Sequence, residues 1–138
     1  MYRKIPIIVG GSIVCLIVIL IGFTIRINTI RNNTEYKNEL KQYVTELNNL
    51  SEEEKMVIYI AIDHIKNPET IKNNRLIAIY RISEKYPAEM DIDIKTESGI
   101  KIQANDWQVD IGDSHQHGNF SAIIDGDTLE FIMQIPIA

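Results

Sequence analysis

An uninterrupted apolar stretch near the start of the chain constrains its fold more than any other feature. Residues 5–25 carry no charged side chain, and only Ser12 and Thr24 are polar among them. As a helix of about 21 residues this stretch would be about 31 Å long, which matches the roughly 30 Å hydrocarbon core of a bilayer. A secretory signal peptide would have a shorter apolar core and small residues at its cleavage site, which residues 20–26 lack. The sequence therefore predicts an uncleaved, single-pass transmembrane helix within residues 1–27.

Basic residues flank both ends of this predicted helix. Arg3 and Lys4 precede it, whereas Arg26, Arg31 and Lys37 follow it. An excess of Lys and Arg normally marks the cytoplasmic side, and the two counts are close here. A short basic head before a long apolar run is typical of a signal-anchor, so we expect the domain at 35–138 on the periplasmic, or an equivalent extracytoplasmic, side of a cell inner membrane. A cytoplasmic domain is the alternative that the flanking charges leave open.

The rest of the chain is strongly acidic. All 19 Asp and Glu residues follow residue 32, together with ten of the 14 Lys and Arg residues, which leaves that part with a formal charge of −9. Nucleic acid is not an expected partner, because binding to phosphate backbones depends on Lys and Arg. A basic protein is expected instead, since complementary charge speeds encounter. The single cysteine, Cys15, lies in the apolar stretch, so the acidic part has no disulfide and no cysteine metal ligand.

Two helices are predicted to follow a short linker. Residues 28–34 are polar and poor in helix formers, which indicates a juxtamembrane linker. Apolar residues then recur at helical spacings of three and four, at Tyr36, Leu40, Tyr43, Leu47 and Leu50. Ser51 and Glu54 have the spacing of a capping box. They precede the apolar residues 56–62, which predict a second, largely buried helix.

A third helix is predicted between two prolines. Pro68 suits a first helical turn, and Pro87 would end the helix. Its inner stripe would consist of Ile71, Ala78, Ile82 and Tyr86.

From residue 90 the apolar period changes to two, which is typical of half-buried strands. Strands are predicted at 90–94, 100–104, 107–111, 120–124 and 128–135. Between the last two, Asp125-Gly126 predicts a tight hairpin turn with positive φ at Gly126. Two or three helices packed on an antiparallel meander of four to five strands make residues 35–138 an α+β domain.

The loop that follows the strand at 107–111 holds the residues with the most ligand-like chemistry. His115 and His117 are two apart and would point the same way from an extended chain, and Asp110 or Asp113 would add an oxygen ligand. A zinc site would need a third or fourth ligand brought in by the fold. The alternatives are a polar loop with no ligand and a loop whose charge responds to pH, because histidine titrates near neutrality.

Two acidic pairs, Asp91 with Asp93 and Asp125 with Asp127, are interpreted as structural residues or as a recognition surface. The surface predicted to contact a protein partner consists of Asp91, Asp93, Asp110, Asp113, His115 and His117.

Two single residues carry further predictions. His64 is expected to bond the last carbonyl groups of a helix. Trp107 is interpreted as a core residue, with an exposed interface anchor as the alternative. The sequence contains no nucleophile elbow, glycine-rich phosphate loop or zinc-protease motif, so neither catalysis nor a cofactor is expected.

Two protein families share this layout. An apolar N-terminal helix followed by more helix and an antiparallel sheet resembles type IV pilins and pseudopilins. Here, however, Gly22-Phe23-Thr24 stands at the end of the apolar run instead of before it, and the run contains no Glu. One membrane helix with a small acidic helix-and-sheet domain is similar to the anchored periplasmic immunity proteins that protect bacteriocin producers.

The second likeness implies a non-catalytic binding domain that neutralises a toxin or hydrolase in the cell envelope. The first implies the alternative function, a structural subunit of an envelope assembly or secretion machine. Both likenesses rest on layout, and no residue motif carries either of them.

Overall fold

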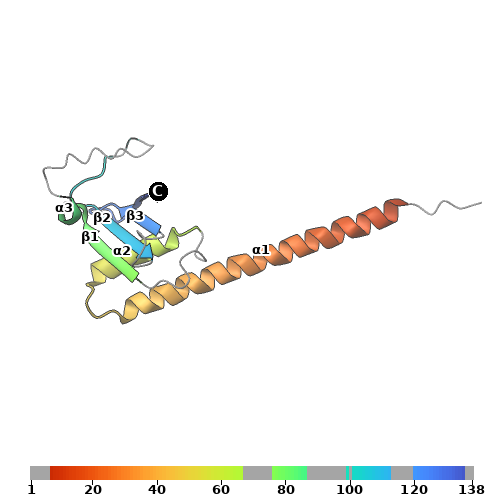
Figure 1. Cartoon of the computed structure of the whole chain (residues 1–138), viewed down its shortest axis with the longest axis horizontal. Coiled ribbons are helices and arrows are strands. Elements are labelled where there is room, and N and C mark those ends of the chain that lie inside the picture. Colours follow the sequence, from red (N-terminus) through yellow and green to blue (C-terminus); the bar gives the residue numbers. More distant parts are fainter. Residues whose placement is uncertain (1–6, 67–75, 87–98, 100, 113–119, 136–138) are drawn as a thin grey trace, which may run out of the picture. The chain divides into compact units, whose positions relative to one another are not determined.

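The computed structural model describes residues 7–66, 76–86, 99, 101–112 and 120–135, with side chains from residue 14 onward. Its elements are α1 (Ile7–Glu46), α2 (Glu52–Asp63), β1 (Leu76–Arg81), α3 (Ile82–Lys85), β2 (Trp107–Gly112), β3 (Phe120–Ile124) and β4 (Phe131–Ile135) (Figure 1). The chain divides into two compact units, Met1–Glu35 and Tyr36–Ala138. Most of α1 makes up the first unit, and its last turns belong to the second.

The helix α1 is continuous over 40 residues, which corresponds to a length of about 60 Å. From Val14 onward it includes a stretch that is long and apolar enough to cross a membrane. Among the residues that the structure describes, none of that stretch is buried. A long apolar helix in the core of a soluble protein would be covered by other elements, so this exposure favours a membrane span.

The linker predicted at 28–34 is wrong, because these residues continue α1. The segment contains no glycine or proline. The hydroxyl groups of Thr29 and Thr34 donate to the carbonyl oxygens of Ile25 and Ile30, each at 3.0 Å, and so are satisfied within the helix. Extending a formed helix costs far less than nucleating one, and this outweighs the weak helix propensity of asparagine and threonine.

In the second unit, the described residues form one four-stranded sheet in the order β1-β2-β3-β4, with all neighbours antiparallel. The predicted α+β fold with an antiparallel sheet is thereby confirmed. Figure 1 shows α2 lying along one face of the sheet. The core between helices and sheet is built from α1 (Tyr36, Leu40, Val44), α2 (Val57, Ile58, Ala61, Ile62), β2 (Trp107, Val109, Ile111) and β3 (Phe120, Ala122, Ile124).

The helix α2 forms as its sequence predicts. Ser51 Oγ accepts the backbone N–H of Glu54 at 3.2 Å, and a Glu54 carboxylate oxygen accepts the N–H of Ser51 at 2.7 Å. This capping box satisfies two donors that the first turn leaves free. Lys41 of α1 pairs with Asp63 at 2.7 Å, so the end of α1 is tied to the end of α2.

The helix predicted between Pro68 and Pro87 is wrong over residues 76–81, which form the strand β1. Ile77 and Ile79 alternate with Ala78 and Tyr80, and both isoleucines pack against the core. Pairing with β2 joins Ile77 to Ile111 and Ile79 to Val109 in register. Branched and aromatic side chains favour this pleated, half-buried environment, and the spacing that suggested a helical stripe is incidental.

The remaining strand predictions have mixed outcomes. The strands at 107–111 and 120–124 are confirmed, and the last strand begins at Phe131, later than expected. The segment 101–104 is not a strand, although Lys101 makes a single bridge and Ile102 is buried. The strand predicted at 90–94 lies outside the described residues.

The hairpin prediction between β3 and β4 is wrong in its geometry. The two strands are joined by a longer loop, in which the Asp125 N–H donates to the Glu130 carbonyl at 2.9 Å. The residue with positive φ is Leu129, at 58°, and not Gly126. Gly126 is needed for a close approach, because a Cβ at this position would lie 2.7 Å from the Asn105 carbonyl carbon.

Candidate functional site

Of the six residues predicted to form a protein-binding surface, the structure describes one, Asp110 in β2. Five lie outside the described residues, namely Asp91, Asp93, Asp113, His115 and His117. Within the described part of the chain, no three His, Cys, Asp or Glu side chains are placed to hold a metal ion. The zinc prediction therefore stays a prediction.

Asp110 is the centre of a polar cluster on the sheet face that points away from α2. One carboxylate oxygen accepts the Tyr80 hydroxyl, and the other accepts the Ser121 hydroxyl. The Gln108 amide donates to the latter oxygen at 2.9 Å. Lys85 Nζ lies 3.4 Å from the carboxylate and also donates to the Tyr80 oxygen. Three neighbouring strands and α3 thus converge on one carboxylate.

The backbone register explains this convergence. In the β1–β2 pair Tyr80 stands opposite Gln108, and in the β2–β3 pair Asp110 stands opposite Ser121. Side chains two residues apart on a strand lie on the same face. These four side chains therefore share one face, and α3 begins directly after β1 and brings Lys85 to it.

The cluster fixes the ionisation of its members. Burial by itself raises the pKa of Asp110, but hydrogen bonds from Ser121, Tyr80 and Gln108, together with the Lys85 charge, lower the net pKa below the ordinary value. Burial, then the hydrogen bond to Asp110 and its negative charge, raise the pKa of Tyr80. Asp110 thus stays a carboxylate and Tyr80 a phenol at neutral pH. Neither is poised for proton transfer, which needs a pKa near the working pH.

The cluster also contains a buried acceptor. Gln108 is 3% exposed, and its amide nitrogen is engaged with Asp110 and Ser121. Its carbonyl oxygen Oε1 has no hydrogen-bond partner within the described residues.

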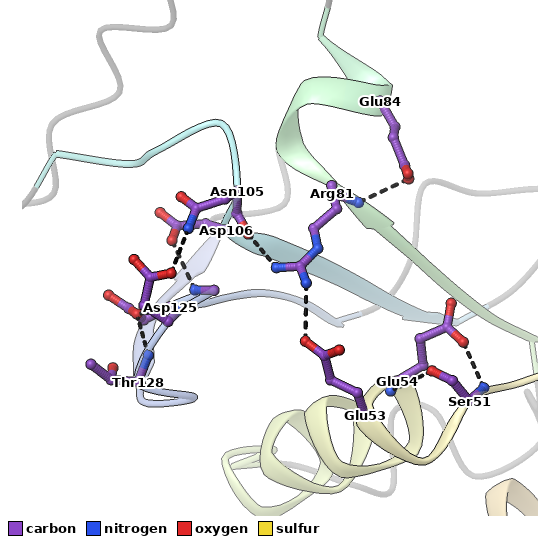
Figure 2. A network of polar contacts seen from close by, with 11 residues as sticks. Ser51, Glu53, Glu54, Arg81, Glu84, Asn105, Asp106, Asp125 and Thr128 are labelled. Carbon is purple, nitrogen blue, oxygen red and sulfur yellow. Dashed lines mark hydrogen bonds and ion pairs between the residues drawn. The ribbon is translucent and has the colours of Figure 1, made fainter.

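A second network lies at the junction of α2, β1 and the segment before β2 (Figure 2). Arg81 donates to Glu53 of α2 at 3.0 Å and to the Asn105 carbonyl oxygen. Its guanidinium stacks on the Trp107 ring, 3.5 Å from the ring centre. Trp107 is 7% exposed and belongs to the core. It is therefore the core residue that the sequence predicts, and not an exposed interface anchor. Arg81 therefore ties the helix layer to the sheet.

Asp106 and Asp125 hold the loops beside this network, as Figure 2 shows. The buried Asp106 carboxylate accepts the N–H groups of Gln103 at 2.7 Å and Gly126 at 3.0 Å. Asp125 accepts the N–H groups of Thr128 at 2.7 Å and Asp127 at 2.9 Å, and these two bonds lower its pKa. Asp127 accepts the Asn105 side-chain amide at 2.9 Å. This acidic pair shapes the β3–β4 loop.

His64 behaves as its position predicts. Its Nδ1 lies 2.9 Å from the carbonyl oxygen of Ile60, one turn earlier in α2. The imidazole also stacks on the Phe131 ring at 3.9 Å between ring centres and 2° between planes. The residue thus joins the C-terminal end of α2 to β4.

Sequence reasoning missed Tyr80, Lys85 and Ser121 as partners of Asp110. Tyr80 and Lys85 lie within the segment interpreted as one helix, and the alternation of residues 76–81 is the signal that identifies β1.

No protein-family model, curated protein or solved structure matches this chain.

Proposed function

We propose that this protein is a single-pass membrane-anchored, non-catalytic binding domain whose partner is a basic protein. The observation that carries the proposal is the apolar stretch of α1, whose described side chains are exposed. Exposed apolar side chains along that helix, such as Ile19 at 65% and Phe23 at 65%, are compatible with lipid and unfavourable in water. The helix therefore serves as an anchor.

The charge of the second unit supports the proposed partner. Several carboxylates project into solvent, and the Glu52 side chain is 92% exposed while that of Asp63 is 55% exposed. With a formal charge of −9 after residue 32, the domain attracts a basic surface and repels an acidic one. The partner that we propose is a toxin or hydrolase acting in the cell envelope, which the domain neutralises from the extracytoplasmic side of the membrane.

The first arm of the test addresses the membrane orientation. Reporter enzymes that work only in the cytoplasm or only outside it are fused after Ala138. We expect activity from the extracytoplasmic reporter alone. Activity from the cytoplasmic reporter alone would remove the envelope toxin from the proposal.

The second arm addresses the partner. The product of a neighbouring gene that encodes a basic envelope-active toxin or hydrolase is mixed with the full-length chain in mild detergent. We expect a complex that abolishes the toxic or hydrolytic activity, with an association rate that falls as salt screens the charges. Absence of such binding, together with co-purification of the chain in a stoichiometric multiprotein assembly, would favour the structural-subunit alternative.

A further inference from the structure

The helix α1 carries a distinctive face just after its apolar stretch. Arg26, Ile27, Ile30 and Arg31 fall within an arc of about 140° at 100° per residue. All four are exposed, with Ile27 at 49% and Ile30 at 57%. We call these four residues the juxtamembrane face. The opposite side of the same turns carries Asn28, Thr29 and Asn32.

The arginines of this face have no internal role in the described part of the chain. Neither the Arg26 nor the Arg31 side chain makes a hydrogen bond or an ion pair with a described residue. The next two basic residues of α1 differ, because Lys37 donates to the Asp63 carbonyl at 2.7 Å and Lys41 pairs with the Asp63 carboxylate. The fold therefore uses the two lysines and leaves the two arginines available to an external anion.

The position of the juxtamembrane face along α1 identifies where that anion lies. If residues 5–25 fill the hydrocarbon core of about 30 Å, the headgroup layer adds roughly 5 to 7 Å on each side. Residues 26–31 rise by about 9 Å along the helix and therefore reach through that layer. Arginine matches phosphate geometry with two parallel N–H bonds, while its aliphatic stem and nearby isoleucines suit the acyl boundary.

We propose that the juxtamembrane face binds the phosphate headgroups of anionic lipids. The proposal rests on the membrane anchor of the proposed function. It commits to lipid and not to a second protein helix, because the face combines cationic groups with apolar ones at headgroup depth. The remainder of the chain beyond residue 32 is acidic and is repelled by an anionic surface, so these arginines supply the complementary charge.

The experiment uses the full-length chain reconstituted into phosphatidylcholine vesicles that contain phosphatidylglycerol. Spin-labelled lipids of each type report, by electron spin resonance, which lipid the protein selects. We expect selection of phosphatidylglycerol, with a loss of about fivefold in that preference for each arginine replaced in the Arg26→Gln, Arg31→Gln variant. The preference should also fall at high salt, since exposed charges are screened.

A charge-matched control is the Lys66→Gln, Lys101→Gln variant, which removes two exposed positive charges elsewhere. It should select phosphatidylglycerol as the wild type does. Equal lipid preference in the wild type and the arginine variant would overturn the proposal. So would a preference lost equally in both double variants, which would indicate a non-specific charge effect.

Failure of the anchor itself gives a different result. In that case the full-length chain would not float with vesicles of phosphatidylcholine alone, and the membrane part of the proposed function would fall together with this inference. Flotation without lipid selection would overturn only the inference. If Ile27→Ala, Ile30→Ala changed self-association while lipid selection was absent, the face would be a contact between helices instead.

Discussion

Asp106 and Asp110 are four residues apart in the chain, yet each accepts hydrogen bonds from a different set of donors. Asp106 accepts hydrogen bonds from two backbone N–H groups and so links the segment before β2 to the β3–β4 loop. Asp110 accepts hydrogen bonds from side chains of three strands and so links those strands on the sheet face opposite α2. A carboxylate taken from water must recover its lost hydrogen bonds within the protein. In both cases some of the recovered bonds come from segments that are distant in sequence, namely from Gly126 for Asp106 and from Tyr80 and Ser121 for Asp110.

Replacing Asp110 by Asn tests the role of this cluster. The amide can accept from only one side and leaves Tyr80 or Ser121 without its acceptor, so we expect a loss of about 1–3 kcal/mol in unfolding free energy at pH 7. Because the folded-state pKa of Asp110 is lowered, the carboxylate stabilises the fold fully above the unfolded value of about 3.9. Its contribution is lost as pH falls from there through the folded pKa.

The measurement is thermal or denaturant unfolding of the full-length chain in detergent, followed by fluorescence of the single tryptophan, Trp107. The difference in unfolding free energy between wild type and Asp110→Asn should be largest near neutral pH and should narrow as pH falls below the unfolded value of about 3.9. Glu39→Gln, which replaces an exposed acid of α1, serves as the control and should leave stability nearly unchanged. A gap that stayed constant with pH would contradict the assigned role.

Gly126 provides a second test at this scale. Its replacement by Ala would place a Cβ 2.7 Å from the Asn105 carbonyl carbon and 2.8 Å from the Arg81 guanidinium. The backbone of residue 105 cannot swing aside, so overpacking should cost about 1–3 kcal/mol and disturb the Arg81 contacts. Gly22→Ala is the control and should leave stability nearly unchanged, because a Cβ at Gly22 would meet no atom within 4 Å and its φ is not positive. A Gly126→Ala variant with unchanged stability would refute the close approach.

At the scale of elements, local signals identify α2 but misassign β1. The capping box at Ser51 and the apolar run behind it specify a helix within one short segment. The apolar residues of β1 fit both a helical and a strand periodicity. The strand conformation forms because β2 pairs with every residue of β1. The break predicted at 28–34 fails in the same way, because continuation of a long helix outweighs the composition of one segment.

The assignment of β1 predicts opposite responses at two adjacent positions. Ala78 is exposed and stands opposite Asp110 in register, so Ala78→Lys should change unfolding free energy by less than about 0.5 kcal/mol. Ile79 packs on the core, and Ile79→Lys should cost about 2 kcal/mol or more, because apolar burial is lost and a charge is partly desolvated. Denaturant unfolding of both variants measures the difference. The reverse order would restore the helical interpretation, in which Ala78 faces inward.

At the scale of the whole molecule, the sequence predicts the features that depend on composition and short-range pattern. These are the apolar helix, the acidic composition of the remaining chain, and an α+β fold with an antiparallel sheet. It does not predict which residues meet across the sheet, since Tyr80, Asp110 and Ser121 are brought together only by strand register. The Arg81–Trp107 stack depends equally on that register. Long-range pairing is the information that a single chain's periodicity does not carry.

The long sequence separation between α2 and the strands β2 and β3 that cover it has a consequence for the order of folding. The helices α1 and α2 are consecutive in the chain and contact each other across 14 residues from Thr45 to Tyr59, at 2.8 Å, and across 22 residues from Lys41 to Asp63, so they can associate early. The buried face of α2 is covered by β2 and β3, and β2 begins only at Trp107. During synthesis this apolar face emerges well before the strands that cover it. Forming such long-range contacts is slow, and until they form the exposed apolar face of α2 makes the nascent domain prone to aggregation.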